Sequence, residues 1–263
     1  MPHVPVRGVQ VWAEWGDAKT GVPLAMVTGM ANALDWLLPL ARLLEADFQW
    51  ASFDYPGCGR SGPTEKYDVA ELADTTVALM QHLGHERFDV LGLSMGGMVV
   101  QELLVNHRDR VTGAVLVSSA VQQTALDIMA AAAGAPAAPL SPAERVRASV
   151  AAIFSPEFRA GDRFEDWAEW QTALAAPADA LAGWLGAAAA HDVLDRLEQV
   201  DVPVLVVTGD ADVLARPEHS KELAARLLNS RLVVVEGGAH GLVYEHPELV
   251  ADAITEGSPA AAG

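Results

Sequence analysis

Short apolar runs alternate with amphipathic segments along most of the chain. Six runs have the length and composition of buried β-strands, at residues 23–28, 48–53, 88–93, 111–119, 203–208 and 231–236. Helical periodicity separates most of them, at residues 34–46, 68–83, 95–107, 217–228 and 247–255. Strands that alternate with helices are typical of parallel pairing. The pattern therefore predicts an α/β fold, a mostly parallel sheet in three layers, preceded by an antiparallel pair of short strands around Gly8.

Residues 121–192 interrupt this alternation. They contain no strand pattern, only Ala-rich helical stretches broken by Gly and Pro, and they hold Trp167, Trp170 and Trp184. We expect this segment to form a helical cap, or lid, over a core built from residues 1–120 and 193–256. A peripheral helical decoration is the alternative. Residues 257–263 are small and weakly patterned, and we expect a disordered tail there.

The composition limits the partners and the location. A chain of 263 residues suits one α/β domain with an insertion. The net charge of −18 argues against nucleic acid and against an anionic membrane surface. One cysteine, Cys58, provides neither a disulfide framework nor a thiolate-built metal site. No secretory-signal pattern or apolar run of membrane-spanning length is present. We therefore expect a soluble cytoplasmic protein that needs no metal or organic cofactor, and its oligomeric state stays open.

The stretch "FDVLGLSMGGMVVQE" at residues 88–102 carries the first chemical signal. A predicted strand turns directly into a predicted helix, and Ser94 lies at the junction between Gly92 and Gly96. Such a sharp turn leaves no room for side chains beside its apex, and glycine removes that clash. The pattern is the G-x-S-x-G nucleophile elbow, which exposes a serine at the end of a strand. A glycine-softened turn with an idle serine is the alternative.

A serine hydroxyl becomes a good nucleophile only when a base accepts its proton. Of the eight histidines, His240 follows the last strand in a glycine-rich loop, at the sheet edge where sites of open α/β sheets form. A carboxylate must hold the imidazole, and Asp210 and Asp212 both follow the preceding strand. We favour Asp212, which lies further along the loop, and expect Asp210 to stabilise the turn.

With these residues in place, the chain resembles the α/β-hydrolase superfamily over residues 4–255. The motifs that carry the resemblance are "FDYPGCGRSG" (53–62), "GLSMGG" (92–97), "GDAD" (209–212) and "GGAHG" (237–241). The stretch "GLSMGGMV" is most similar to serine ester and lactone hydrolases such as the 3-oxoadipate enol-lactonases. The resemblance implies a catalytic triad of Ser94, Asp212 and His240.

Two positions depart from the family pattern. Thr28 precedes Gly29 where family members usually have histidine, and Cys58 occupies a second common histidine position. Nothing around Cys58 indicates thiolate activation, so we interpret it as structural. An oxyanion hole needs two N–H groups aimed at one point. The elbow supplies the Met95 N–H, and the resemblance implies the Met30 N–H.

The remaining candidates concern substrate contact. Trp36, Trp167, Trp170 and Leu214 are predicted to line the substrate pocket, although the two cap tryptophans equally suit packing of the cap onto the core. Asp54 in "FDYPGCGRSG" is interpreted as a turn stabiliser rather than a catalyst.

These residues predict a serine hydrolase that cleaves a small ester or lactone through an acyl-enzyme. The same triad also serves thioesterases, acyltransferases, C–C hydrolases and cofactor-free perhydrolases, and a non-catalytic ligand-binding protein on the same fold is a further alternative. Acidic residues outnumber arginines in the cap, so we expect neutral rather than anionic substrates.

Overall fold

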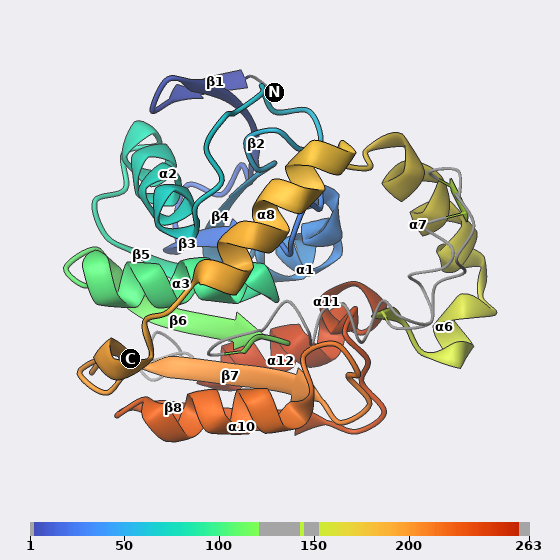
Figure 1. The fold of residues 1–263 in the computed structure, drawn as a ribbon. Helices are drawn as coiled ribbons and strands as arrows, with labels where there is room; N and C mark the ends of the chain where they lie inside the picture. The colour runs from blue at the N-terminus through green and yellow to red at the C-terminus, as the bar shows by residue number, and fades with distance from the viewer. Residues whose placement is uncertain (1–2, 121–142, 145–152, 258–263) are drawn as a thin grey trace.

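An eight-stranded sheet forms the centre of the protein, seen in a computed structural model that describes residues 3–120, 143–144 and 153–257 (Figure 1). The strands lie in the order β1-β2-β4-β3-β5-β6-β7-β8. Their bounds are β1 His3–Val6, β2 Val9–Trp15, β3 Val22–Val27, β4 Phe48–Phe53, β5 Phe88–Leu93, β6 Val111–Val117, β7 Val204–Gly209 and β8 Ser230–Val235. All six predicted strand runs and the N-terminal pair are present.

The pairing of the strands decides where a site can form. β1 pairs with β2, and β2 with β4, in antiparallel fashion, whereas every pair from β4 to β8 across the sheet is parallel. The carboxyl ends of β3 to β8 therefore share one edge of the sheet. The loops that leave those ends meet above it, which is where open α/β sheets bind ligands.

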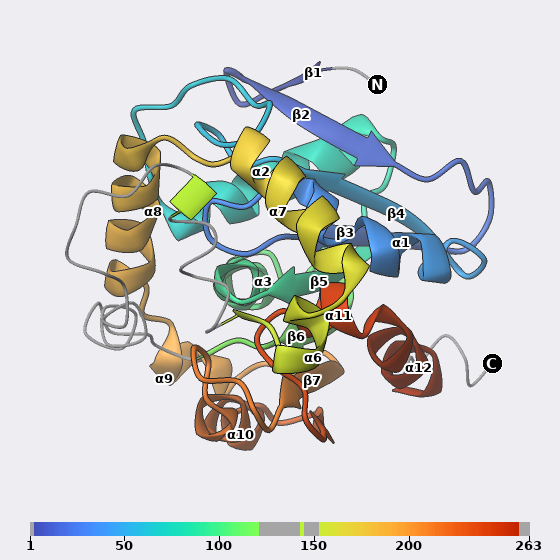
Figure 2. The same ribbon diagram turned by 90° about the vertical axis from the view of Figure 1, so that its right-hand side faces the viewer.

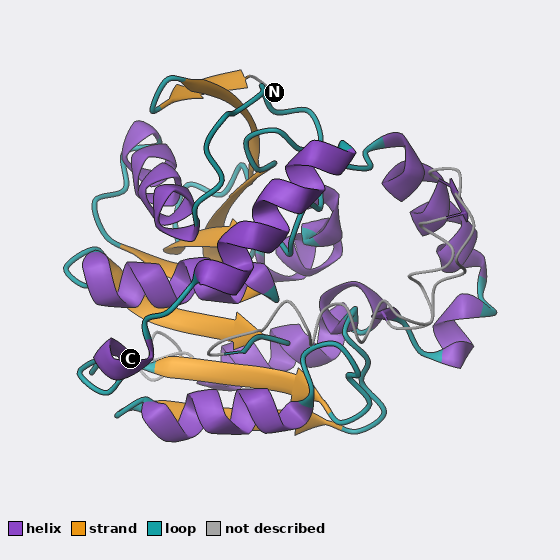
Figure 3. Ribbon diagram, viewed as in Figure 1, coloured by secondary structure: helices purple, strands orange, loops and turns teal. Residues whose placement is uncertain are grey.

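Two helical layers cover the sheet, and together they form the three-layer α/β fold that the sequence predicts (Figure 3). One face packs against α2 (Val69–His82), α3 (Met95–Asn106) and α10 (Pro217–Arg226), and the other against α1 (Leu38–Leu44) and α12 (Pro247–Gly257). Each layer buries its own apolar cluster against the sheet. The inner parallel strands are mainly apolar on both faces because both faces are covered, whereas the edge strand β8 keeps exposed positions.

Two predicted elements end differently in the structure. The predicted helix at residues 34–46 is divided into a 3-10 turn, η1 (Leu34–Trp36), and α1, which begins at Leu38. The Leu34 N–H donates to Asp54 Oδ1, and Pro39 occupies the first turn of α1, where proline is favoured. The predicted strand at 111–119 ends at Val117, since Ser118 adopts a positive φ of 48°. Both changes occur at the carboxyl edge of the sheet.

In the described residues between β6 and β7, the regular elements are all helices. They are α6 (Pro156–Arg159), α7 (Asp162–Ala173), α8 (Ala178–Ala190) and α9 (Leu194–Leu197). Figure 2 looks toward the carboxyl edge of the sheet and shows α7 crossing in front of it, with α8 to one side. Residues 121–142 and 145–152 of the predicted cap, and 258–263 of the predicted tail, lie outside the described residues.

None of the described helices is by itself long and apolar enough to span a membrane. The pair α7 and α8 satisfies that test by length and composition, but the two helices are bent by 100° relative to each other.

Candidate active site

Ser94 lies at the apex of a strained turn between β5 and α3. Its φ of 54° and ψ of −118° are unusual for a residue with a side chain, and such strain costs about 1–3 kcal/mol. The Ser94 N–H donates to the Val117 carbonyl on β6, and Ser119 Oγ donates to the Ser94 carbonyl at 2.9 Å. These two bonds hold the turn in place on the side of the neighbouring strand.

The two flanking glycines are required by space, as the sequence predicts. A Cβ on Gly92 would lie 2.2 Å from the Gly96 carbonyl oxygen, and a Cβ on Gly96 would lie 2.2 Å from the carbonyl oxygen of Val27. Both obstacles are backbone atoms, which cannot rotate away as a side chain would. The elbow is therefore packed directly against the end of β3.

Asp212 and His240 form a buried pair on the loops after β7 and β8. His240 Nδ1 lies 2.9 Å from Asp212 Oδ2, and the Asp212 side chain is fully buried. Asp212 Oδ1 also accepts the N–H groups of Leu214 and Ala215, each at 2.9 Å. A carboxylate can only accept, so the neutral imidazole carries its proton on Nδ1 and its acceptor nitrogen is Nε2.

Asp210 has a different place in the same loop. Its Oδ1 accepts the Gly237 N–H at 2.7 Å, which joins the turn after β7 to the turn after β8. Of the two carboxylates that the sequence offers, Asp212 is the one that contacts His240.

The segment after β3 lies beside the elbow. The Asn32 N–H donates to the Gly29 carbonyl at 3.3 Å, and Ala31 between them has a φ of 54°. Met30 is the second residue of this turn, a position whose N–H the turn itself does not use. The Met95 N–H is the first of α3 and has no partner within the helix. The two predicted oxyanion donors thus come from adjoining turns.

Buried polar groups hold that segment in position. The Tyr55 hydroxyl donates to the Thr28 carbonyl, and Thr28 Oγ1 lies 3.5 Å from the Ala33 carbonyl oxygen. Thr28 is fully buried, so the departure from the family pattern is accommodated by these contacts. Asp54 accepts the N–H groups of Leu34 and Arg60 at 2.7 and 2.8 Å, consistent with its interpretation as a turn stabiliser.

Cys58 behaves as an unreactive buried side chain. It is 1% exposed, and burial raises the pKa of its thiol from 9.0 to about 12. A thiol with this pKa carries almost no thiolate at neutral pH. Among the described residues, no group of three or more His, Cys, Asp or Glu side chains is arranged to hold a metal ion.

The predicted pocket residues divide into two groups. Trp36 and Trp167 are 2% and 1% exposed, and they belong to a cluster of aromatic rings that joins the helices after β6 to the core. The other rings of this cluster are Phe154, Phe158, Phe164, Trp170 and Tyr244. The contacts of Trp167 favour the packing role over contact with substrate. Trp170 and Leu214 are half-buried and keep the pocket role as a prediction.

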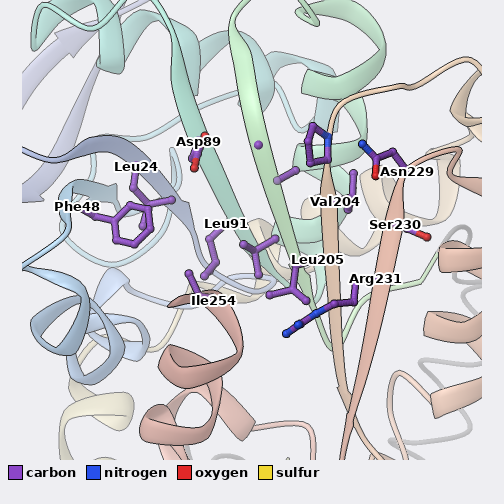
Figure 4. A pocket seen from close by; sticks show the side chains of 14 residues that line it. Leu24, Phe48, Asp89, Leu91, Val204, Leu205, Asn229, Ser230, Arg231 and Ile254 are labelled. Carbon is purple, nitrogen blue, oxygen red and sulfur yellow. The ribbon is translucent and has the colours of Figure 1, made fainter. Parts of the chain in front are cut away.

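A crevice of about 140 Å³ lies at the opposite edge of the sheet, at the amino ends of the parallel strands (Figure 4). Its walls are mainly apolar side chains, among them Leu24, Leu91, Val115, Leu205 and Ile254. It contains none of the predicted site residues, and it lies at the wrong end of the strands for a loop-built site.

Sequence reasoning missed several residues that shape the site. Tyr55 holds the Thr28 carbonyl, Ser119 holds the Ser94 carbonyl, and Gln171 on α7 contacts both Trp36 and Asn32. None of the three has a periodicity or spacing signal, although Tyr55 lies inside the "FDYPGCGRSG" motif.

The sheet order, the strained serine turn after β5 and the Asp–His pair after β7 and β8 define an enzyme of the α/β-hydrolase class. Residues 26–253 match the model of the alpha/beta hydrolase family. The chain belongs to that family and is a hydrolase-type enzyme.

Individual relatives within the family differ in their chemistry. The chain is 28% identical over 278 residues to a putative non-heme chloroperoxidase from Synechocystis sp., covering 95% of this chain and 97% of the relative. It is 27% identical over 237 residues to a pimeloyl-(acyl-carrier protein) methyl ester esterase from Neisseria meningitidis, covering 84% and 70% respectively. An enol-lactonase structure from Burkholderia xenovorans LB400 has a TM-score of 0.85 at 21% identity, covering 97% and 98%, and shows the shared fold.

Proposed function

We propose that the protein is a serine hydrolase that cleaves a small, neutral ester or lactone through an acyl-enzyme. Ser94 Oγ attacks the substrate carbonyl carbon while His240 Nε2 accepts the Oγ proton. The tetrahedral intermediate collapses, the bond to the alkoxy group breaks, and His240 returns the proton to that oxygen. Water then attacks the acyl-enzyme with His240 again as the base, which releases the acid and regenerates Ser94.

The observation that carries this proposal is the 2.9 Å contact between His240 Nδ1 and the buried Asp212 carboxylate. It fixes the tautomer that leaves Nε2 ready to accept a proton, and it stabilises the imidazolium formed in each step. Asp212 has no freedom to turn away, because its other oxygen is held by two backbone N–H groups.

The oxyanion hole is proposed to consist of the Met30 and Met95 N–H groups. Backbone donors of this kind are placed before the reaction and need no reorganisation as charge develops on the carbonyl oxygen. Two features support the assignment. Met95 begins α3 directly after the nucleophile, and a Cβ on Gly29, the residue before Met30, would lie 3.5 Å from Ser94 Cβ.

The balance of charges in the described residues after β6 supports the proposed preference for neutral substrates. Arg163 is used in packing: it donates to the Tyr244 and Glu245 carbonyls and lies over the Phe158 ring. Acidic residues Glu157, Asp162, Glu165, Asp166 and Glu169 surround it in sequence. Arg145 and Arg147 lie outside the described residues.

Perhydrolysis is a second candidate, favoured by the similarity to the putative chloroperoxidase. Hydrogen peroxide would replace water in the second step and release a peracid from the same acyl-enzyme. Thioester, acyl-transfer and C–C substrates use the same opening attack by serine.

A fluorophosphonate probe tests the proposal directly, because it reacts covalently only with an activated serine. Wild-type protein should be labelled at Ser94, and Ser94→Ala should not be labelled while keeping the wild-type melting temperature. A panel of esters, lactones and thioesters, with and without peroxide, then identifies the preferred reaction. An unlabelled, folded wild-type protein would refute the proposal.

A further inference from the structure

A chain of hydrogen bonds connects α7 to the turn beside the elbow. Trp36 Nε1 donates to Gln171 Oε1 at 2.7 Å, and Gln171 Nε2 donates to Asn32 Oδ1 at 3.2 Å. Trp36 belongs to η1, Gln171 to α7, and Asn32 ends the turn that contains Met30. Figure 2 shows α7 passing over this end of the sheet.

The indole N–H of Trp36 determines the donor and acceptor at every step of this series of hydrogen bonds. An indole N–H only donates, so the Gln171 atom that faces it must be the carboxamide oxygen. The other end of that carboxamide is an NH₂ group, which also only donates, so Asn32 must present its oxygen to Gln171. The Asn32 carboxamide consequently has one permitted orientation, and its Nδ2 faces away from Gln171.

That orientation places the Asn32 NH₂ group near the nucleophile. Asn32 Nδ2 lies 3.2 Å from the point where a Cβ on Gly29 would be, and Ser94 Cβ lies 3.5 Å from the same point. Nδ2 and Ser94 Cβ are therefore no further apart than the sum of these distances. Among the hydrogen bonds of the described residues, none is donated by Asn32 Nδ2, and Asn32 is half-buried.

We propose that Asn32 Nδ2 is a third donor to the oxyanion, and that Gln171 is the positioning residue that turns this donor toward it. The inference rests on the proposed function, since it assumes attack by Ser94 on a carbonyl group. Asn32 belongs to the same short turn as Met30, so both donors approach the carbonyl oxygen from one side. A site with three donors suits acyl substrates such as esters and lactones, because the oxyanion formed from their carbonyl group can accept three hydrogen bonds.

The alternative is that the three side chains merely fasten α7 to the core. The substitution Gln171→Glu separates the two possibilities. A carboxylate at position 171 still accepts the Trp36 N–H, so that attachment is kept. Its second oxygen also only accepts, however, so Asn32 must rotate its carboxamide and present Nδ2 to position 171. The Asn32 Oδ1 atom, which only accepts, then takes the place of the Nδ2 donor near Ser94. This change is caused by a substitution on α7, a different element from the one that carries Asn32.

The experiment measures the second-order rate constant for fluorophosphonate labelling and kcat for 4-nitrophenyl acetate. Asn32→Leu and Gln171→Glu should each lower both by about 10- to 100-fold, the scale of one lost oxyanion donor or slightly below it. The double variant should be no slower than Asn32→Leu alone, because the effect of position 171 passes through Asn32. KM should change little. Glu169→Gln, the converse substitution on the exposed side of α7, is the matched control and should label at the wild-type rate.

Each outcome has a distinct meaning. Absence of labelling in the wild type would refute the proposed function itself. Labelling of wild type, Asn32→Leu and Gln171→Glu at one rate would refute the third donor and leave the serine hydrolase intact. Additive losses in the double variant, or a loss in Gln171→Glu that follows a lowered melting temperature, would show fastening instead of positioning. If Asn32→Leu fails to fold, Asn32→Asp keeps the shape, places an acceptor at the same position, and should show the same loss.

Discussion

Replacing Asp212 by asparagine should disable the protein while leaving its fold unchanged. Asp212 Oδ1 accepts two backbone N–H groups, from Leu214 and Ala215, so the asparagine oxygen must remain at that position. The asparagine NH₂ group is then forced into the place of Oδ2, 2.9 Å from His240 Nδ1. A donor there requires Nδ1 to accept, which moves the histidine proton to Nε2. The base can then no longer take the proton of Ser94.

The expected loss in kcat is about 10⁴, equivalent to about 5 kcal/mol of transition-state stabilisation. The assay is hydrolysis of 4-nitrophenyl acetate, with melting temperature as the check on folding. Asp210→Asn is the matched control, because its oxygen can still accept the Gly237 N–H and its activity should stay within a few fold. A greater loss in Asp210→Asn than in a folded Asp212→Asn protein would refute the assignment of the acid.

Three further predictions concern the neighbouring elements. Gly29→Val should lower kcat about 100-fold by displacing the Met30 turn from Ser94, whereas Thr28→Val should retain most activity because Tyr55 binds the backbone carbonyl of residue 28. The ratio of kcat/KM for a neutral ester to kcat/KM for its carboxylated analogue should exceed one, and a ratio below one would contradict the predicted substrate polarity. Trp170→Ala should change this ratio if the Trp170 ring contacts the substrate. Folding raises the pKa of the Cys58 thiol from 9.0 to about 12, so the stability contributed by the protonated thiol is fully present below pH 9. It should fall by about 1.4 kcal/mol per pH unit between pH 9 and about pH 12. Urea unfolding of Cys58→Ala should show a correspondingly shallower alkaline decline.

The fold was predictable from the sequence because its main signals are local. The inner parallel strands are largely covered on both faces and read as nearly continuous apolar runs, so they are visible without knowledge of their neighbours. The elbow is equally local: the clash of Gly92 with Gly96 is a contact between residues four apart. His240 and Asp212 follow from the rule that parallel strands end at one edge. Their pairing in the structure shows that a topological rule can bring together residues that are distant in sequence.

The features that the sequence did not reveal are those whose meaning depends on a partner on another element. Gln171 is an ordinary polar residue on a helix, and only its position between an indole N–H and a carboxamide gives its orientation a consequence. Trp167 reads as a large apolar surface suited to substrate, and its burial against Trp36 and Phe154 appears only after the helices dock. Hydrophobic periodicity predicts which residues are buried, but it does not predict which side chains they pack against. An oxyanion site depends on which groups donate and which accept. In this protein those roles are determined by contacts between side chains on different elements. A search for positioning residues in this fold should therefore begin at side chains that can only donate or only accept, such as Trp36 and Asp212, and follow the orientations that they impose.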